Sequence, residues 1–221
     1  MIVNERIVAY INSLDRGNSP ICNTIEKEAI EDDVPIIRKE MGNLLKVLLE
    51  LKQPQSILEV GTAVGYSSIL MSENMPEGCI IDTIENYDKR IPIARNNFKR
   101  AGKEDCIRLI EGDAMEVLKE LEGPYDFIFM DAAKGQYIHY MPEAVRLLAD
   151  GGILMSDNVL QDGDIIESRF AVERRNRTIH SRMRDYLYEL KHSNVLETSI
   201  IPLGDGVALS IKKKKEEKEN R

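Results

Sequence analysis

Cysteine and histidine are scarce in this chain, and their placement excludes two kinds of site. The 221 residues include three histidines scattered along the sequence and three cysteines that form no CxxC pair. An odd, dispersed set of thiols argues against a disulfide framework and against a zinc site built from paired cysteines. This usage suits a reducing compartment. The cysteines are Cys22, Cys79 and Cys106.

Long apolar runs and a positive net charge are also missing, which limits the partners. No stretch approaches the roughly 18 apolar residues that a membrane-spanning helix needs. Residues 1–6 lack the basic-then-apolar pattern of a secretory signal. The formal net charge is −8, so the chain as a whole does not attract nucleic acid or anionic membranes, although a local patch could override this. We expect a cytoplasmic protein without a membrane partner.

The length and the apolar pattern predict one α/β domain. A chain of 221 residues with 43% apolar content can build one sizeable core but not two. From residue 53 onward, short apolar runs alternate with amphipathic stretches, which is typical of a parallel sheet covered by helices. We expect a helical region over 1–52, a Rossmann-like core over 53–212 and a disordered charged tail over 213–221. The expected strands are 56–60, 79–84, 107–110, 125–130, 151–155, 196–202 and 206–211, and the expected helices are 7–14, 21–30, 41–51, 66–75, 88–101, 113–121, 136–148 and 172–192.

Two of these strands run directly into oxygen-bearing side chains. Strand 125–130 is followed by Asp131, and strand 151–155 by Ser156 and then Asp157-Asn158. Ligands of open α/β sheets bind beyond the carboxyl ends of the strands. Two carboxylates and an amide oxygen are hard ligands of the kind that Mg²⁺ or Ca²⁺ takes. We therefore expect Asp131, Asp157 and Asn158 to hold a divalent cation; the alternatives are a helix cap and an Asx turn.

A glycine-rich turn after the first strand indicates a second ligand. Residues 57–68 read as a strand, a turn with Gly61 and Gly65, and a helix start, which lets the backbone and free N–H groups approach a ligand. The GxxxG spacing differs from the GxGxxG pattern of dinucleotide enzymes, so an NAD-dependent dehydrogenase is a poor fit. Glu85 ends the next strand about 20 residues on, where a carboxylate can accept hydrogen bonds from ribose hydroxyls.

The third strand completes this pattern with Asp113 and Ala114. Asp113 could accept a hydrogen bond from an adenine amino group, while Ala114 leaves room for the ring. The alternatives are a solvated strand end for Glu85 and a helix N-cap for Asp113. Three successive strand ends that carry suitable groups together favour an adenosine-containing ligand.

These motifs resemble those of the class I S-adenosylmethionine (SAM)-dependent methyltransferases. The resemblance implies a seven-stranded Rossmann-like fold with an antiparallel last strand, which suits the Asp-Gly hairpin signal at residues 204–206. It also implies that SAM is the cofactor. The residues it assigns are Glu59 and Gly61 near the methionine part, Ser67 near its carboxylate, Glu85 on the ribose, Asp113 and Ala114 on the adenine, a backbone contact at Ile37, and Asp131, which the cofactor and metal sites share.

Methyl transfer to a hydroxyl oxygen is a reaction in which a bound divalent cation would have a direct chemical role. A neutral hydroxyl is a poor nucleophile at pH 7, and a divalent cation on its oxygen lowers its pKa and fixes its position. Lys134 follows Asp131 by three residues and could take the proton or stabilise the oxyanion; the alternative is a surface lysine paired with Asp131 or with phosphate. The arrangement resembles the cation-dependent O-methyltransferases, including the catechol and caffeoyl-CoA enzymes, over about residues 35–212. The plant acyl-CoA enzymes carry an acid where this chain has Ala133, which argues against a phenylpropanoid substrate.

An arginine-rich segment follows the metal residues. Five arginines fall within residues 174–184, and Arg169 lies just upstream. Arginine binds phosphate and stacks on bases, so the segment favours RNA; the alternatives are a solvated helix face and a dimer contact. With residues 131–137 and 201–206, it resembles the bacterial tRNA 5-hydroxyuridine methyltransferases, which implies that wobble 5-hydroxyuridine becomes 5-methoxyuridine. The family also suggests a homodimer. The candidate contacts to the anticodon loop are Arg169, Arg174, Arg175, Arg177, Arg182 and Arg184.

Two other functions stay open. A small-molecule O-methyltransferase of the catechol or caffeoyl-CoA type would need an apolar mouth that grips aromatic rings, whereas the chain has no Trp and four Phe. A binding module without catalysis is disfavoured because Lys134 and all three metal ligands are present. The ligand types do not select among Mg²⁺, Mn²⁺ and Ca²⁺.

Overall fold

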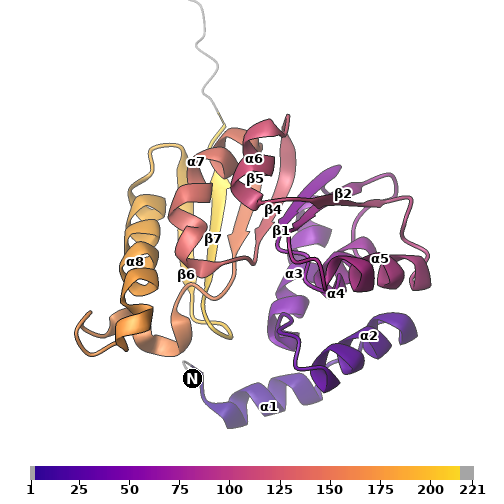
Figure 1. Ribbon diagram of the computed structural model, residues 1–221, viewed down its shortest axis with the longest axis horizontal. Helices are drawn as coiled ribbons and strands as arrows, with labels where there is room; N and C mark the ends of the chain where they lie inside the picture. Colours follow the sequence, from indigo (N-terminus) through magenta and orange to yellow (C-terminus); the bar gives the residue numbers. More distant parts are fainter. Residues whose placement is uncertain (1–2, 215–221) are drawn as a thin grey trace, which may run out of the picture.

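The chain folds around one seven-stranded sheet with the strand order β3-β2-β1-β4-β5-β7-β6. The structure, a computed structural model, describes residues 3–214 (Figure 1). Strands β1 to β5 are parallel, whereas β7 runs antiparallel to both β5 and β6. This confirms the expected α/β fold of the methyltransferase class. The strands are β1 (Ser56–Val60), β2 (Ile80–Glu85), β3 (Ile107–Glu111), β4 (Tyr125–Met130), β5 (Leu148–Ser156), β6 (Leu196–Ile201) and β7 (Val207–Lys212).

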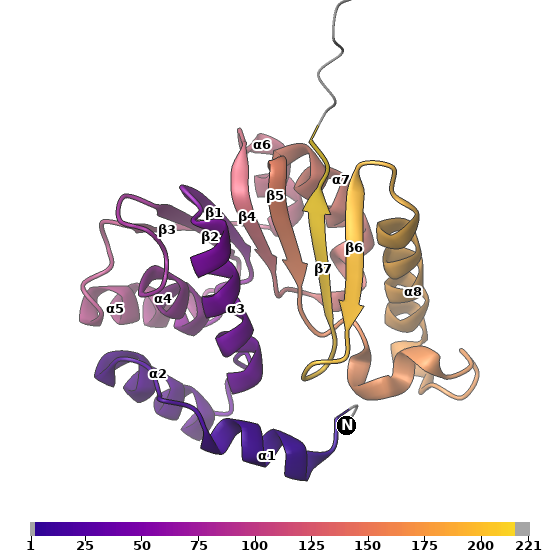
Figure 2. The ribbon, with the colours of Figure 1, turned by 180° about the vertical axis from the view of Figure 1, so that it is seen from behind.

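Helices cover both faces of the sheet, as Figures 1 and 2 show from opposite sides. Neighbouring strand residues point to opposite faces, so Ile57 belongs to one apolar cluster and Leu58 to the other. The first cluster packs under α2 to α5 and the second under α6 to α8. Each large apolar side chain that is fully buried contributes about 1.5–3 kcal/mol. The helices are α1 (Glu5–Ser13), α2 (Pro20–Glu31), α3 (Lys39–Lys52), α4 (Tyr66–Ser72), α5 (Ile91–Arg100), α6 (Ala114–Glu120), α7 (Tyr137–Leu147) and α8 (Arg177–His192), with short 3₁₀ turns η1 (Lys134–Gln136), η2 (Gln161–Ile166) and η3 (Arg174–Asn176).

The expected helix over 172–192 was wrong at its beginning, because α8 starts only at Arg177. The Arg177 guanidinium donates hydrogen bonds of 3.2 Å to the backbone carbonyls of Val172 and Phe170. These two hydrogen bonds keep the preceding segment in a loop that folds back onto the start of α8. The residues from Gln161 to Asn176 form an irregular segment between β5 and α8, which we call the 161–176 loop.

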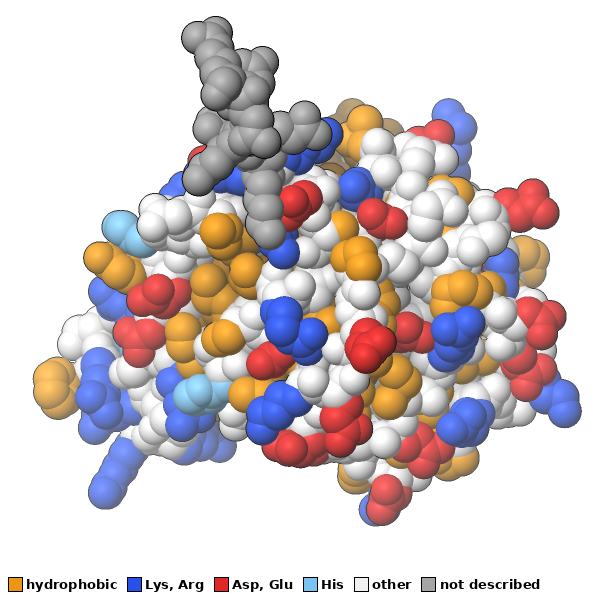
Figure 3. Space-filling view, turned by 90° about the horizontal axis from the view of Figure 1, so that it is seen from above, with side chains coloured by type: hydrophobic (Ala, Val, Ile, Leu, Met, Phe, Trp, Pro, Cys, Tyr) orange, Lys and Arg blue, Asp and Glu red, His pale blue; other side chains and the backbone are white. Residues whose placement is uncertain are grey.

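The surface above the amino ends of the parallel strands mixes charges of both signs. Figure 3 shows Lys and Arg, Asp and Glu, and apolar side chains interspersed on this face, with no large area of one kind. Basic side chains gather at the left edge, where Figure 1 places the 161–176 loop and α8. On this face, the basic cluster expected from the sequence therefore lies at one edge of the molecule.

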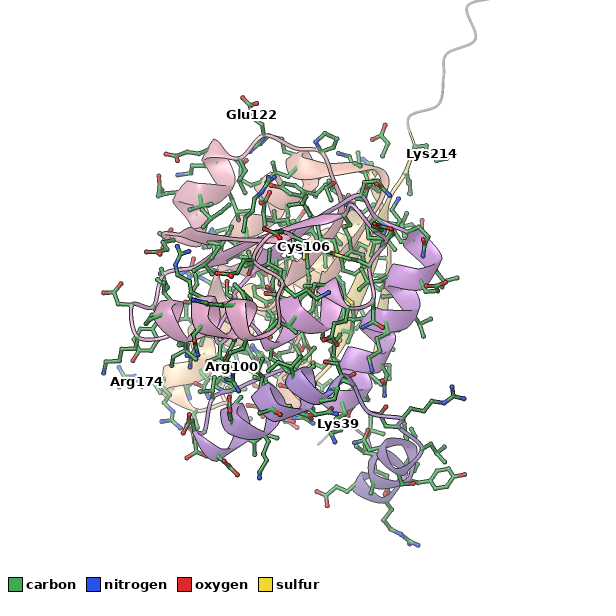
Figure 4. The ribbon with its side chains drawn as sticks, turned by 90° about the vertical axis from the view of Figure 1, so that its right-hand side faces the viewer. Lys39, Arg100, Cys106, Glu122, Arg174 and Lys214 are labelled. Carbon is green, nitrogen blue, oxygen red and sulfur yellow. The ribbon has the colours of Figure 1, made fainter. Side chains whose placement is uncertain are left out.

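Helix α2 is joined to α5 by an ion pair. The Arg100 guanidinium reaches from α5 toward α2 (Figure 4) and donates to both carboxylate oxygens of Glu28, at 2.6 and 2.8 Å. Local chemistry also starts α2, since the Ser19 side chain accepts the Cys22 N–H and Pro20 occupies the first turn. The chain that leaves α2 passes through residues 35–38, which border the cavity described below.

Helix α1 has no buried residue and exposes an apolar face. The exposed apolar residues are Ile7, Tyr10 and Ile11 on the helix and Leu14 at its C-cap. The expected homodimer stays a prediction, and this face is a surface on which to test it. Among residues 3–214, no helix is long and apolar enough to cross a bilayer. Of the expected disordered tail, Lys213 donates its N–H to the Val195 carbonyl, and residues 215–221 lie outside the described residues.

Candidate active site

A cavity of about 460 Å³ opens beyond the carboxyl ends of the parallel strands. It lies where the strand order reverses between β1 and β4, which is the usual ligand site of an open α/β sheet. Its size suits a cofactor-sized ligand. Two expected site residues, Glu59 and Asp113, do not line it. The expected residues that do are Ile37, Gly61, Ser67, Glu85, Ala114, Asp131, Lys134, Asp157 and Asn158.

The cavity has a cofactor half, beyond the ends of β1, β2 and β3, and a second half, beyond the ends of β4 and β5. Gly61 allows these two halves to adjoin. Its φ is +104°, a conformation that favours glycine, and a Cβ there would overlap the backbone carbonyl oxygen of Asp131. The end of β1 can therefore touch the end of β4 only because residue 61 has no side chain. Gly61, an expected cofactor residue just after β1, consequently adjoins Asp131, the first expected metal ligand.

Glu59 lies behind the cavity wall rather than in it. Its carboxylate is fully buried and accepts hydrogen bonds from the hydroxyls of Ser67, Ser68 and Thr83. Burial raises the pKa of Glu59 to about 7, and the three hydroxyl donors oppose that rise. Because Ser67 lines the cavity, Glu59 fixes a residue of the wall. Its expected contact with the methionine part of SAM stays a prediction.

The two other acidic residues of the cofactor half differ in what they do. Glu85 lines the cavity, and its carboxylate accepts backbone N–H groups of Ala63 at 2.8 Å and of Asn86 and Tyr87 at 3.0 Å. A carboxylate has about four lone-pair positions, so it can still accept a ribose hydroxyl. The Asp113 side chain caps α6 by accepting the Met115 N–H at 2.9 Å. This helix N-cap was the alternative to the expected adenine contact.

The carboxylates of Asp131 and Asp157 have few donors from the protein. Among the described residues, Asp131 receives no side-chain hydrogen bond, and Asp157 receives only the Asn158 N–H at 2.7 Å. Burial raises the pKa of Asp131 to about 6. Burial, and then the neighbouring charge of Asp131, raise the pKa of Asp157 to about 7. Asp157 is buried and Asp131 is half-buried. Carboxylates in this position that lack donors fit a divalent cation, which would supply the missing positive charge.

The third ligand of such a cation would have to be an amide. Within residues 3–214, no group of three or more His, Cys, Asp or Glu side chains is placed to hold a metal. The amide oxygen of Asn158 is a further possible ligand, and Asn158 lines the same cavity with φ +57°. The set of two carboxylates and one amide oxygen matches the hard ligands that Mg²⁺ and Ca²⁺ take.

Buried tyrosines join the ends of β4 and β5, which precede the expected metal ligands Asp131 and Asp157. The Tyr137 hydroxyl lies 3.2 Å from the backbone carbonyls of both Met130 and Asp157, and it can donate to either. Its ring packs edge-on against Tyr186, whose hydroxyl lies 2.6 Å from that of Ser156. The spacing between Asp131 and Asp157 is thus fixed by the core.

Lys134 contacts a residue that sequence reasoning missed. Its ammonium lies 3.2 Å from a carboxylate oxygen of Asp205, in the loop between β6 and β7, rather than pairing with Asp131. The Asp-Gly signal at this position indicated only a hairpin turn. The sequence also did not single out several other residues that line the cavity, namely Arg38, Thr62, Tyr66, Arg90 and Tyr140.

Comparisons with known proteins agree with this geometry. The family model for O-methyltransferases matches residues 16–213. A catechol O-methyltransferase from Niastella koreensis is 31% identical over 168 residues, covering 74% of this chain and 70% of that protein. Caffeoyl-CoA O-methyltransferase 2 from Populus trichocarpa is 31% identical over 182 residues, covering 76% and 71%.

Solved structures with bound cofactor share the fold. An S-adenosylhomocysteine (SAH)-bound methyltransferase from Podospora anserina has a TM-score of 0.85 at 27% identity and covers 95% of each chain. The O-methyltransferase TomG from Streptomyces achromogenes, in complex with SAM, has a TM-score of 0.83 at 25% identity, covering 96% of this chain and all of that one. The chain therefore belongs to the O-methyltransferase family and is a SAM-dependent O-methyltransferase of the catechol and caffeoyl-CoA type.

Proposed function

We propose that this enzyme methylates 5-hydroxyuridine at the wobble position of tRNA to 5-methoxyuridine, with Mg²⁺ or another divalent cation. The main support is that Asp131, Asp157 and Asn158 adjoin both Lys134 and the cofactor cavity, with the arginine-bearing 161–176 loop directly after them. The 5-hydroxyl of this base stands beside the C4 carbonyl. Those two oxygens can share one cation, as the two oxygens of a catechol do.

The chemistry needs few groups from the protein. Bound SAM supplies an electrophilic methyl group, so the protein mainly has to orient and deprotonate the acceptor. A divalent cation held by Asp131, Asp157 and Asn158 would lower the pKa of the acceptor hydroxyl. Lys134 lines the same cavity and is placed to receive the proton or to stabilise the oxyanion.

The arginines near the site fall into three groups, which narrows the proposed RNA contacts. Arg177, Arg182 and Arg184 donate to backbone carbonyls of Phe170, Gly135 and Glu167 respectively, so they hold the 161–176 loop and η1 in place. Arg175 pairs with Glu173 at 2.7 Å. Among the described residues, Arg169 and Arg174 have no hydrogen-bond or ion-pair partner, and both are exposed. These two are the arginines most available for phosphate.

An exposed aromatic ring accompanies them. Phe170 is 82% exposed, and its backbone carbonyl and ring are both held by Arg177, whose guanidinium carbon lies 5.8 Å from the ring centroid. Exposed aromatic rings beside arginines stack on the bases of single-stranded RNA. The loop therefore suits an anticodon loop better than a small catechol, which would leave these side chains without a role.

The deciding experiment offers the enzyme both acceptor classes. Purified protein with SAM and Mg²⁺ receives either tRNA that carries 5-hydroxyuridine or a simple catechol, and products are measured by mass spectrometry. We expect 5-methoxyuridine to form with a kcat/KM well above that for the catechol. Rapid catechol turnover without any 5-methoxyuridine would contradict the proposal and leave the small-molecule alternative.

A further inference from the structure

The hairpin between β6 and β7 contacts the segment that follows the metal residues. The N–H groups of Val159 and Leu160 donate to the carbonyls of Gly206 and Asp205, at 3.0 and 2.9 Å. Gly206 has φ +91°, and a Cβ there would overlap the backbone and side chain of Leu160. This glycine is needed for the close approach. The hairpin tip is therefore fixed beside Asn158 rather than free in solvent.

The Asp205 carboxylate at this tip has a partner on each oxygen. It is only 6% exposed. Its Oδ2 lies 3.2 Å from the Lys134 ammonium, and its Oδ1 accepts the backbone N–H of Asp162. Burying a carboxylate is costly unless it is paired and hydrogen-bonded, so this residue is held in one position. It joins η1, which carries Lys134, to the start of the 161–176 loop.

We infer that Asp205 is a positioning residue for methyl transfer, because it holds the Lys134 ammonium at the cavity. The Lys134 side chain is 36% exposed, and a lysine has a flexible stem with three rotatable donors, so an unpaired ammonium would sample many positions. A fixed partner restricts it to the side of the cavity where Asp131 and Asp157 also lie. This inference rests on the proposed role of Lys134 in the reaction.

The substitution Asp205→Asn isolates this role. Asparagine has nearly the same shape, and its Oδ1 still accepts the Asp162 N–H, but its amide cannot pair with an ammonium. We expect kcat to fall about 100-fold, in the range that one group stabilising the acceptor oxyanion contributes, because the ammonium is no longer held in place. The KM for SAM should stay within about threefold, because cofactor binding does not involve this pair. Asp205→Glu, which keeps the charge, should recover part of the loss. Asp164→Asn, which changes an exposed aspartate on the adjoining 161–176 loop, serves as the matched control.

A double-mutant cycle with Lys134→Ala tells a positioning role from a structural one. If Asp205 acts through Lys134, adding Asp205→Asn to Lys134→Ala should lower kcat no further. Multiplied losses would overturn the inference. Amine acylation read by peptide mass spectrometry supplies a test that needs no turnover: Lys134 should react several-fold faster in Asp205→Asn than in the unsubstituted enzyme. Equal labelling would also overturn the inference.

These outcomes are separable from the fate of the proposed function. If the unsubstituted enzyme methylates a catechol but not tRNA, the proposed substrate is wrong, and the cycle is then measured with the catechol. If tRNA is methylated and Asp205→Asn has unchanged kcat, only the positioning role fails. Should Asp205→Asn unfold in thermal melts, Asp205→Glu carries the test: a displaced carboxylate should lower kcat while the KM for SAM is kept, and an unchanged kcat would overturn the inference.

Discussion

The two halves of the cavity treat their carboxylates differently. In the cofactor half, Glu59 behind the wall and Glu85 on it each accept three hydrogen bonds from the protein. In the half beyond β4 and β5, Asp131 accepts none from the described residues and Asp157 accepts one. Carboxylates that already accept hydrogen bonds can have a purely structural role in the cavity wall. Carboxylates that are shielded from solvent and have few donors need a bound positive charge instead. From this difference we expect that, if a cation binds, only the second half depends on it.

The largest expected effect comes from removing a carboxylate of the second half. Asp157→Ala and Asp131→Ala should each lower turnover by about 10³-fold or more, because a metal contributes several kcal/mol of transition-state stabilisation. Asp157→Ala should retain SAH affinity, measured by calorimetry. Asp164→Asn, which changes an exposed aspartate of the neighbouring loop, should keep its activity. Near-normal turnover in both alanine variants would contradict the expectation that the second half depends on a cation.

A second effect tests how closely the halves adjoin. Gly61→Ala forces a Cβ against the Asp131 carbonyl, so we expect a loss of about 3 kcal/mol in the free energy of unfolding and weaker SAH binding. Gly78→Ala is the matched control, because Gly78 also has a positive φ, +84°, but nothing lies within 4 Å of its added Cβ. Its cost should be about 1 kcal/mol. Equal losses of unfolding free energy in the two variants, measured in urea, would show that the close contact with Asp131 does not affect stability.

Glu59 makes a comparable contribution that depends on pH. Its folded-state pKa of about 7 is above its ordinary value of 4.5, so the folded protein binds a proton that the unfolded chain has released. Stability should therefore fall as pH rises from about 4.5 to 7, by up to about 3 kcal/mol from this group, and then level off. Glu59→Gln should flatten that slope in urea unfolding at several pH values, without divalent cations. An identical slope in both proteins would mean that Glu59 is not protonated in the folded state.

The smallest expected effect separates the substrates. Arg169→Ala combined with Arg174→Ala should lower kcat/KM for tRNA about tenfold, since two phosphate contacts are lost, and should weaken its salt dependence. Turnover of a catechol should not change. The double substitution Lys27→Ala and Lys99→Ala removes the same charge from α2 and α5 and should leave both substrates unaffected. A loss of catechol turnover in the arginine variant would point to a structural role for the loop.

How much of this the sequence could predict depends on how local each signal is. The strand ends at Gly61, Glu85, Asp131 and Asp157 were predictable, because an apolar strand followed by a polar residue is read within a few positions. The partner of Lys134 was not, since Asp205 lies 71 residues away and its Asp-Gly pair signals a turn by itself. The ion pair exists only once β7 has paired with β5.

The arginines show the same limit. Six of them formed one group in the sequence. In the fold, however, Arg177 and Arg184 of α8 donate to carbonyls of the 161–176 loop, while Arg169 and Arg174 face solvent. Their roles depend on where the backbone folds back, which residue spacing does not encode. The same fold-back explains why the helix start was placed too early.

The most direct test of the central claim is divalent-cation binding itself. Mn²⁺ titrated into the enzyme and followed by electron paramagnetic resonance should show one site per chain. That site should be lost in Asp157→Asn and kept in Asp164→Asn and Glu85→Gln, because only the half beyond β4 and β5 needs a cation. Absence of a stoichiometric site, or a site that survives Asp157→Asn, would contradict the assignment of Asp131, Asp157 and Asn158 to a metal.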